Sequence, residues 1–153
     1  MFAFLRRLLA GFRQPPLLQV AALCWRERPE GGHEVLLIKS LDSGRWIVPK
    51  GWPMPGKSLA EAAEIEAWEE AGVRGELSTK ALGRFPYLKR DDNGIDRPCE
   101  AELYPLKVSH LAEAYPEAGK RKRRWYSPEA AAEAVSEREL ARMIKSYARK
   151  PPC

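Results

Sequence analysis

The chain has 153 residues, of which 44% are hydrophobic and 31% charged, with 26 Lys and Arg against 21 Asp and Glu. This composition is typical of one globular domain, and the lack of an apolar run of roughly 20 residues argues against a membrane-spanning helix. The net charge of +5 favours an anionic partner without distinguishing between polyphosphate, nucleic acid and an anionic membrane. Cys24, Cys99 and Cys153 are too few for a disulfide scaffold and form no zinc motif, so we expect a cytoplasmic protein.

The first 16 residues are expected to form a basic amphipathic segment outside the domain. Its apolar side chains recur at helical spacing with arginines between them: Phe2, Leu5, Leu8, Leu9 and Phe12, with Arg6, Arg7 and Arg13. Two interpretations stay open. One is a short helix packed on the domain or on a second subunit, which leaves room for a homodimer, and the other is a weak anchor on an anionic membrane surface. Pro15 and Pro16 end the segment, so we place the domain at residues 17–148 and a tail at 149–153.

The first half of the domain is expected to hold three strands and one helix. The strands are predicted at residues 19–25, 34–40 and 46–48, because these runs are apolar and bounded by turn residues. Residues 50–57 (KGWPMPGK) predict a loop, since two glycines and two prolines interrupt them. Ser58 and Glu61 then form a capping box that begins a helix, and Gly72 is placed to end it.

The second half is expected to open with a hairpin. Residues 84–90 and 97–108 are its two strands, and Asn93 with Gly94 predicts the turn between them. The remaining elements are a short strand at 124–126, a helix opened by Ser127 and Pro128, and a final helix with a capping box of Ser136 and Glu139. We therefore expect an α+β fold in which a mixed β-sheet lies between helices.

Three glutamates on the first predicted helix are the strongest chemical signal. At about 100° per residue, Glu66, Glu69 and Glu70 fall within an arc of about 100° on one helix face. Carboxylates so close together repel one another, and a divalent cation would turn that repulsion into a binding site. An all-oxygen ligand set suits a hard ion, so Mg²⁺ or Mn²⁺ is expected. The alternative is a solvated acidic helix face.

The segment from Gly51 to Val73, GWPMPGKSLAEAAEIEAWEEAGV, resembles the signature of the Nudix hydrolases, G-x5-E-x7-R-E-U-x-E-E-x-G-U, with U an aliphatic residue. The positions in register are Gly51, Glu66, Ala67, Glu69, Glu70, Gly72 and Val73. Three further segments, RWIVPKGWPM, RPCEAELYPL and GKRKRRWYSPEA, are similar to the diphosphoinositol polyphosphate and diadenosine polyphosphate branch and its bacterial relatives. The resemblance covers residues 17–147 and implies the Nudix fold.

Two positions of the motif depart from the family pattern. Lys57 stands where the family usually has glutamate, and Ile65 stands where it usually has arginine. In the family this arginine is thought to orient the neighbouring glutamate. Its replacement therefore bears on turnover more than on metal binding, because Glu66, Glu69 and Glu70 remain. Lys57 removes one acidic group and could instead sit near a substrate phosphate.

The resemblance also implies a mechanism, in which a metal-activated water attacks a diphosphate. The implied metal ligands are the backbone carbonyl of Gly51 and the carboxylates of Glu66, Glu69 and Glu70. Glu66 or Glu69 would accept the proton of the water. Acids outside the motif stay open as alternatives for this role, namely Glu100, Glu102 and Glu117, although each is also compatible with an ordinary solvated or strand-edge acid.

For contacts to substrate phosphate we expect Arg45 and Lys50, which flank the short strand before the motif, and then Lys39 and Arg90. The basic run at residues 120–124 (KRKRR) is read either as a solvated loop or as a site for the distal phosphates of a long polyphosphate. Nucleic acid is not the expected partner, because no aromatic residues are interleaved with these cations.

Three hypotheses of function follow, in this order. The first is a Mg²⁺-dependent hydrolase that cleaves a diphosphate linkage in a nucleoside diphosphate derivative, a dinucleoside polyphosphate or a diphosphoinositol polyphosphate. The second is a binding or sensory module that keeps the fold but has lost turnover, because of Ile65 and Lys57. The third is removal of the 5′-end group from RNA, suggested by the run at 120–124.

Overall fold

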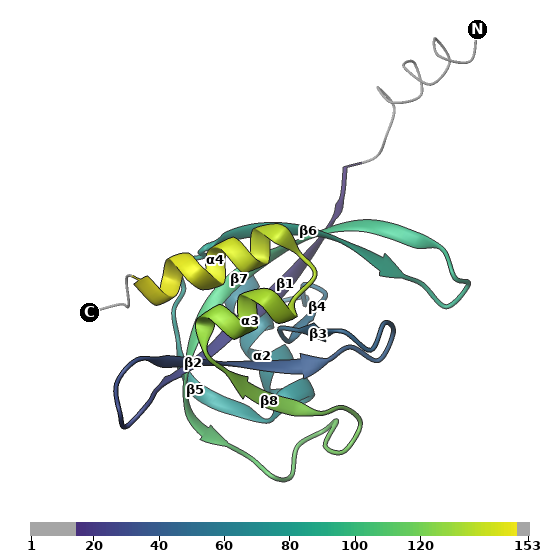
Figure 1. The fold of residues 1–153 in the computed structure, drawn as a ribbon. Coiled ribbons are helices and arrows are strands. Elements are labelled where there is room, and N and C mark those ends of the chain that lie inside the picture. The colour runs from purple at the N-terminus through teal and green to yellow at the C-terminus, as the bar shows by residue number, and fades with distance from the viewer. Residues whose placement is uncertain (1–14, 150–153) are drawn as a thin grey trace, which may run out of the picture.

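A computed structural model describes residues 15–149, which form one mixed β-sheet with helices on both faces (Figure 1). The strands are β1 (Leu17–Glu27), β2 (His33–Lys39), β3 (Trp46–Ile47), β4 (Lys50–Gly51), β5 (Val73–Leu77), β6 (Gly83–Arg90), β7 (Asp96–Leu111) and β8 (Arg123–Tyr126). The helices are α2 (Leu59–Ala71), α3 (Pro128–Ala134) and α4 (Arg138–Arg149). The expected α+β class, with a mixed sheet between helices, is confirmed.

Strand β1 lies at the centre of the sheet. It pairs in parallel with β7, and its C-terminal end pairs antiparallel with β2. Its N-terminal half also pairs antiparallel with the short β4, where Val20 faces Gly51. β7 in turn carries β5 and β6, both antiparallel. The residues from Gln19 to Trp25 are all buried, which a central strand covered on both faces requires and which explains their nearly unbroken apolar sequence.

Helix α2 covers one face of the sheet, and α3 with α4 cover the other (Figure 1). The predicted capping box of α2 is confirmed, since Glu61 N–H donates to Ser58 Oγ at 3.1 Å and Ser58 N–H donates to Glu61 Oε1 at 3.0 Å. Gly72 ends the helix in the left-handed conformation, with φ of 68°. Across residues 15–149, no helix combines the length and apolar character needed to cross a bilayer.

The elements that the sequence analysis missed are short or polar. β4 lies within the predicted loop at 50–57, and its two residues are strand only because β1 runs beside them. β5 (VRGEL) alternates between more and less buried residues, but five residues with a central glycine are too short a run to be recognised, and the pairing with β7 is irregular between Arg74 and Gly75. Helix α4 begins one residue later than expected, because Ala141 N–H donates to Glu137 O. The expectations for residues 1–14 and 150–153 lie outside the described residues.

The hairpin of β6 and β7 offers a matched test of core packing. Phe85 on β6 is fully buried, whereas Leu88 on the same strand is 65% exposed. We expect Phe85→Ala to lower the free energy of unfolding by about 3–5 kcal/mol, because it removes buried surface and leaves a cavity. Leu88→Ala should change it by less than about 0.5 kcal/mol. Urea denaturation of both variants measures the difference, and equal losses would place Phe85 outside the core.

Candidate active site

Glu66 and Gly51 are brought into direct contact. Gly51 is on β4, and the carboxyl group of Glu66 from α2 lies against its Cα, where a Cβ atom would stand 2.2 Å from Glu66 Cδ and 2.3 Å and 2.6 Å from the two carboxylate oxygens. Only glycine leaves room for this approach. Two residues 15 positions apart in the motif therefore meet because β4 pairs with β1 beneath the helix.

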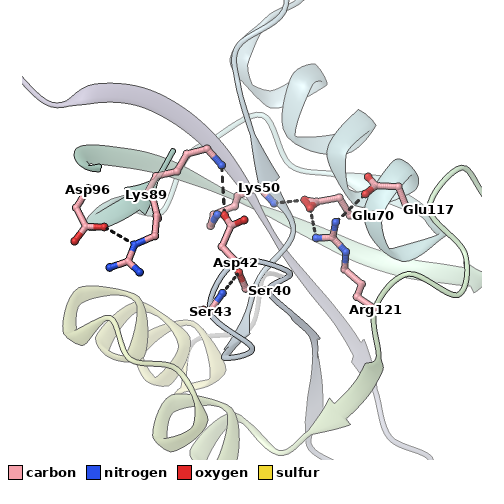
Figure 2. A network of polar contacts seen from close by, with 10 residues as sticks. Ser40, Asp42, Ser43, Lys50, Glu70, Lys89, Asp96, Glu117 and Arg121 are labelled. Atoms are coloured by element: carbon pink, nitrogen blue, oxygen red, sulfur yellow. Dashed lines mark hydrogen bonds and ion pairs between the residues drawn. The ribbon is translucent and has the colours of Figure 1, made fainter. Parts of the chain in front are cut away.

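Glu70 is the most deeply buried of the three motif glutamates, with 8% of the residue exposed. Its Oε1 accepts from the backbone N–H of Lys50 at 2.8 Å, and its Oε2 accepts from Arg121 Nη1 at 2.6 Å (Figure 2). Burial raises the pKa of Glu70, while the Lys50 N–H and the Arg121 guanidinium oppose that rise by stabilising the carboxylate. The side chain is thus held by groups from two other segments of the chain.

Glu66 and Glu69 are less constrained. Both are half-buried, and no described residue donates a hydrogen bond to the Glu66 carboxylate. Burial, followed by the negative charges of Glu70, Glu69 and Glu117, raises the pKa of Glu66 to about 7. Such mutual repulsion is the expected property of carboxylates that gather around a cation.

The ligand atoms that these residues offer are of the type that a hard divalent cation prefers. The donors available around β4 and α2 are carboxylate and carbonyl oxygens, which Mg²⁺ and Mn²⁺ prefer, and Gly51 lets the Glu66 carboxylate lie against the β4 backbone. Among residues 15–149, no three acidic, histidine or cysteine side chains already lie close enough to hold an ion.

Of the three acids proposed outside the motif, Glu117 lies beside the glutamates of α2. Its backbone N–H donates to Glu69 O at 3.0 Å, and its Oε1 accepts from Arg121 Nη2 at 2.7 Å. Glu100 and Glu102 instead pair with Arg84 across the β6–β7 hairpin, at 3.4 Å and 3.2 Å.

The basic run at 120–124 proves to be neither a simple solvated loop nor a continuous cationic surface. Lys120, Lys122 and Arg124 are exposed, whereas Arg121 and Arg123 turn inward. Arg123 Nη1 donates to the carbonyls of Ala71 and Ala112, at 2.9 Å and 2.8 Å, and so holds the C-terminal end of α2. Sequence analysis missed these roles, because all five residues of the run are cations and their sequence does not distinguish inward from outward side chains.

A cavity of about 460 Å³ opens on the other side of β4, between β3 and the β6–β7 hairpin. It is lined by three of the four cations predicted to bind substrate, Arg45, Lys50 and Arg90, and by the rings of Trp46 and Tyr87. Lys39, the fourth, does not line it and lies over the Trp46 ring, 5.5 Å from the centroid. Lys50 connects the cavity to the glutamates, because its side chain lines the cavity and its N–H binds Glu70.

Acidic residues balance much of the positive charge in this cavity. Arg90 pairs with Asp96 at 3.2 Å, and Lys89 lies 3.9 Å from Asp42 (Figure 2). Glu137, at the start of α4, also lines the cavity, and its buried Oε1 has no hydrogen-bond partner among the described residues. Burial and the neighbouring Lys89 lower the pKa of the Lys50 ammonium.

The sequence is similar to those of proteins named as Nudix hydrolases and as diphosphoinositol polyphosphate phosphohydrolases. Nudix hydrolase 21, chloroplastic, of Arabidopsis thaliana is 36% identical over 121 residues, which cover 77% of this chain and 57% of the plant protein. Diphosphoinositol polyphosphate phosphohydrolase 3-beta of Homo sapiens is 36% identical over 122 residues, which cover 78% of this chain and 66% of the human protein. The chain therefore spans less than two thirds of the length of either relative.

A solved structure of C. elegans Ap4A hydrolase superposes with a TM-score of 0.62 at 19% sequence identity, covering 88% of this chain and 98% of that one. At this identity the likeness establishes the fold. A model of the NUDIX domain family matches residues 17–147, which include the sheet, the glutamate helix α2 and most of α4. The chain belongs to the Nudix family.

Proposed function

We propose that this chain is a divalent-metal-dependent hydrolase that cleaves a diphosphate linkage in a nucleotide-containing substrate. The observation that carries the proposal is the contact between Gly51 and the Glu66 carboxylate, next to the buried Glu70 and one residue from a cavity lined by cations. Lys50 belongs to both places, so a diphosphate that enters the cavity would extend towards the glutamates.

The Gly51 carbonyl with Glu66, Glu69 and Glu70 would hold Mg²⁺ or Mn²⁺, which when bound neutralises diphosphate oxygens and lowers the pKa of water. Arg45 and Lys50 would bind the phosphates as they line the cavity. Glu66 is the residue we assign to accept the proton of the attacking water, because no described residue donates a hydrogen bond to its carboxylate. Lys39 and Arg90 would have supporting roles, since one stacks on Trp46 and the other is paired with Asp96.

The charge balance of the cavity favours a nucleotide over an inositol that carries phosphates on most of its carbons. Such an inositol needs many unpaired cations, whereas Lys89 and Arg90 already face Asp42 and Asp96. The aromatic rings of Trp46 and Tyr87 suit a base, and the Glu137 carboxyl group that lines the cavity suits the hydroxyl or amino groups of a nucleoside. We therefore place dinucleoside polyphosphates and nucleoside diphosphate derivatives ahead of diphosphoinositol polyphosphates as substrates.

A panel of these three substrate classes, assayed with Mg²⁺, with Mn²⁺ and with EDTA, tests the proposal. We expect release of phosphate or nucleotide that EDTA reduces to background, and a kcat/KM at least about tenfold higher for the nucleotide substrates. Release that persists in EDTA would contradict the metal dependence. A preference for the diphosphoinositol substrate would contradict the proposed substrate order and leave the hydrolase assignment standing.

Ile65 favours one second candidate, a ligand-binding or sensory module without turnover. This candidate predicts that a nucleotide diphosphate binds to the metal-loaded protein but is recovered intact. Isothermal titration followed by chromatography of the ligand separates the two functions, because only the hydrolase converts the ligand during the measurement.

A further inference from the structure

Arg121 has an unusual environment for a residue in a basic surface run. Its side chain is only 9% exposed, and its guanidinium reaches two carboxylates at once, with Nη1 2.6 Å from Glu70 Oε2 and Nη2 2.7 Å from Glu117 Oε1 (Figure 2). Its Nε is buried and has no partner among the described residues. Lys122 and Arg124, its neighbours in the run, are exposed. The run therefore contributes one guanidinium to the interior of the glutamate cluster.

The contact determines how Glu70 can be oriented. Its two oxygens are held from opposite sides, one by the Lys50 N–H of β4 and the other by Arg121. Each carboxylate oxygen has two lone pairs, so each retains one for a further ligand. The loop that carries Arg121 is itself attached to α2, because Glu117 N–H donates to Glu69 O. Glu70 thus has one orientation, with its remaining lone pairs free.

Stability alone is a weak reason for such an arrangement. Burying a guanidinium and two carboxylates costs desolvation free energy that the ion pairs only partly offset, and well-packed apolar residues are often as stable. The bidentate geometry of arginine is instead suited to holding a carboxylate in a defined direction. The family motif has an arginine for orienting a glutamate at the position that Ile65 occupies in this chain.

We propose that Arg121 is the positioning residue of this active site: from the loop before β8 it compensates for the arginine that is absent at position 65 of α2, by holding Glu70 instead of the neighbouring Glu66. This inference rests on the proposed hydrolase function. In it, Arg121 contacts neither the substrate nor the reacting atoms, and it acts by holding Glu70 and Glu117. Because its positive charge shares the two carboxylates with any bound cation, it also weakens cation binding while orienting the ligands.

The test uses Arg121→Ala and Arg121→Lys in the full chain, with Arg124→Ala as the matched control from the exposed part of the same run. We expect Arg121→Ala to lower kcat about 100-fold with KM changed less than about threefold, because orientation is lost and substrate contacts are not. The dissociation constant for Mn²⁺, measured by electron paramagnetic resonance, should fall at least about threefold. The kcat of Arg121→Lys should be less than about tenfold higher than that of Arg121→Ala, since one ammonium cannot bridge both carboxylates as a guanidinium does.

A second pair of variants tests the compensation. Ile65→Arg should change kcat less than about threefold in the wild-type background but raise it at least about tenfold in the Arg121→Ala background. Equal effects in the two backgrounds would overturn the compensation.

Three results would overturn the positioning role of Arg121. A raised KM with unchanged kcat in Arg121→Ala would make it a phosphate-binding residue. Weaker Mn²⁺ binding together with a lowered melting temperature in Arg121→Ala would mean that Arg121 stabilises the fold of the site. If Arg121→Ala has the same kcat, KM and Mn²⁺ affinity as Arg124→Ala, Arg121 has no role in the site. If the wild-type protein hydrolyses none of the substrates, the proposed function fails by itself, while the Mn²⁺ comparison still tests the pairing of Arg121 with the carboxylates.

Discussion

Glu66→Gln is expected to lower kcat by about 10²–10⁴-fold, because it removes both a ligand oxygen of full negative charge and the proton acceptor assigned to the water. Glu64→Gln is the matched control. Glu64 lies two residues before Glu66 on the same helix and therefore on a different face, so this variant should keep kcat within about twofold. Steady-state hydrolysis of the best substrate in the panel, at saturating Mg²⁺, measures both.

The same substitution should leave the fold intact or stabilise it. In the metal-free protein at neutral pH, the Glu66 carboxylate faces the charges of Glu70, Glu69 and Glu117, and no described residue donates a hydrogen bond to it. Replacing it with a neutral amide of similar size removes this repulsion, so the free energy of unfolding should not fall. A loss of stability as large as the loss of activity would show that Glu66 supports the fold and would remove the basis for its catalytic role.

Gly51→Ala should also lower activity strongly. The added methyl group would lie 2.2–2.6 Å from the Glu66 carboxyl atoms, so the carboxylate has to move away from β4. The atoms displaced are the end of a flexible side chain, and the pairing of β4 with β1 uses the backbone, so the protein should still fold. We expect kcat to fall about 100-fold, with a melting temperature within a few degrees of the wild type, which requires about 1 kcal/mol or less of lost stability.

A double-mutant cycle shows whether this loss acts through Glu66. If displacement of the carboxylate is the cause, Gly51→Ala should add little to Glu66→Gln, and the double variant should be no more than about twofold slower than Glu66→Gln alone. Multiplicative losses would mean that the methyl group disturbs something else, such as the Gly51 carbonyl.

Much of the architecture was predictable because it depends on local rules. The capping box of Ser58 with Glu61 and the stop at Gly72 place helix α2 from sequence alone, since each group satisfies backbone donors or acceptors within a few residues. The Asn93–Gly94 turn similarly predicts the β6–β7 hairpin. β4 and β5 were not predicted, because two residues and a pentapeptide interrupted by Gly75 are too short for a strand period to be recognised, and they become strands beside β1 and β7.

The glutamates show the same division. Their helical spacing places Glu66, Glu69 and Glu70 on one face of α2, and that follows from 3.6 residues per turn without any tertiary contact. The spacing does not say which carboxylate is constrained. Glu70 is held and Glu66 is left without a hydrogen-bond donor because β4 supplies a backbone N–H to one and bare glycine Cα to the other.

Arg121 marks the limit of what sequence determined for this protein. The acidic face of α2 can be read from spacing and side-chain chemistry, and the motif and its departure at Ile65 from the resemblance to the family pattern, because all of these are local features of the sequence. Arg121 reaches Glu70, which lies 51 positions earlier in the chain, because the loop before β8 folds back over α2. Long-range pairing of this kind is set by packing and by the cost of burying charge, and neither leaves a periodic trace in the chain.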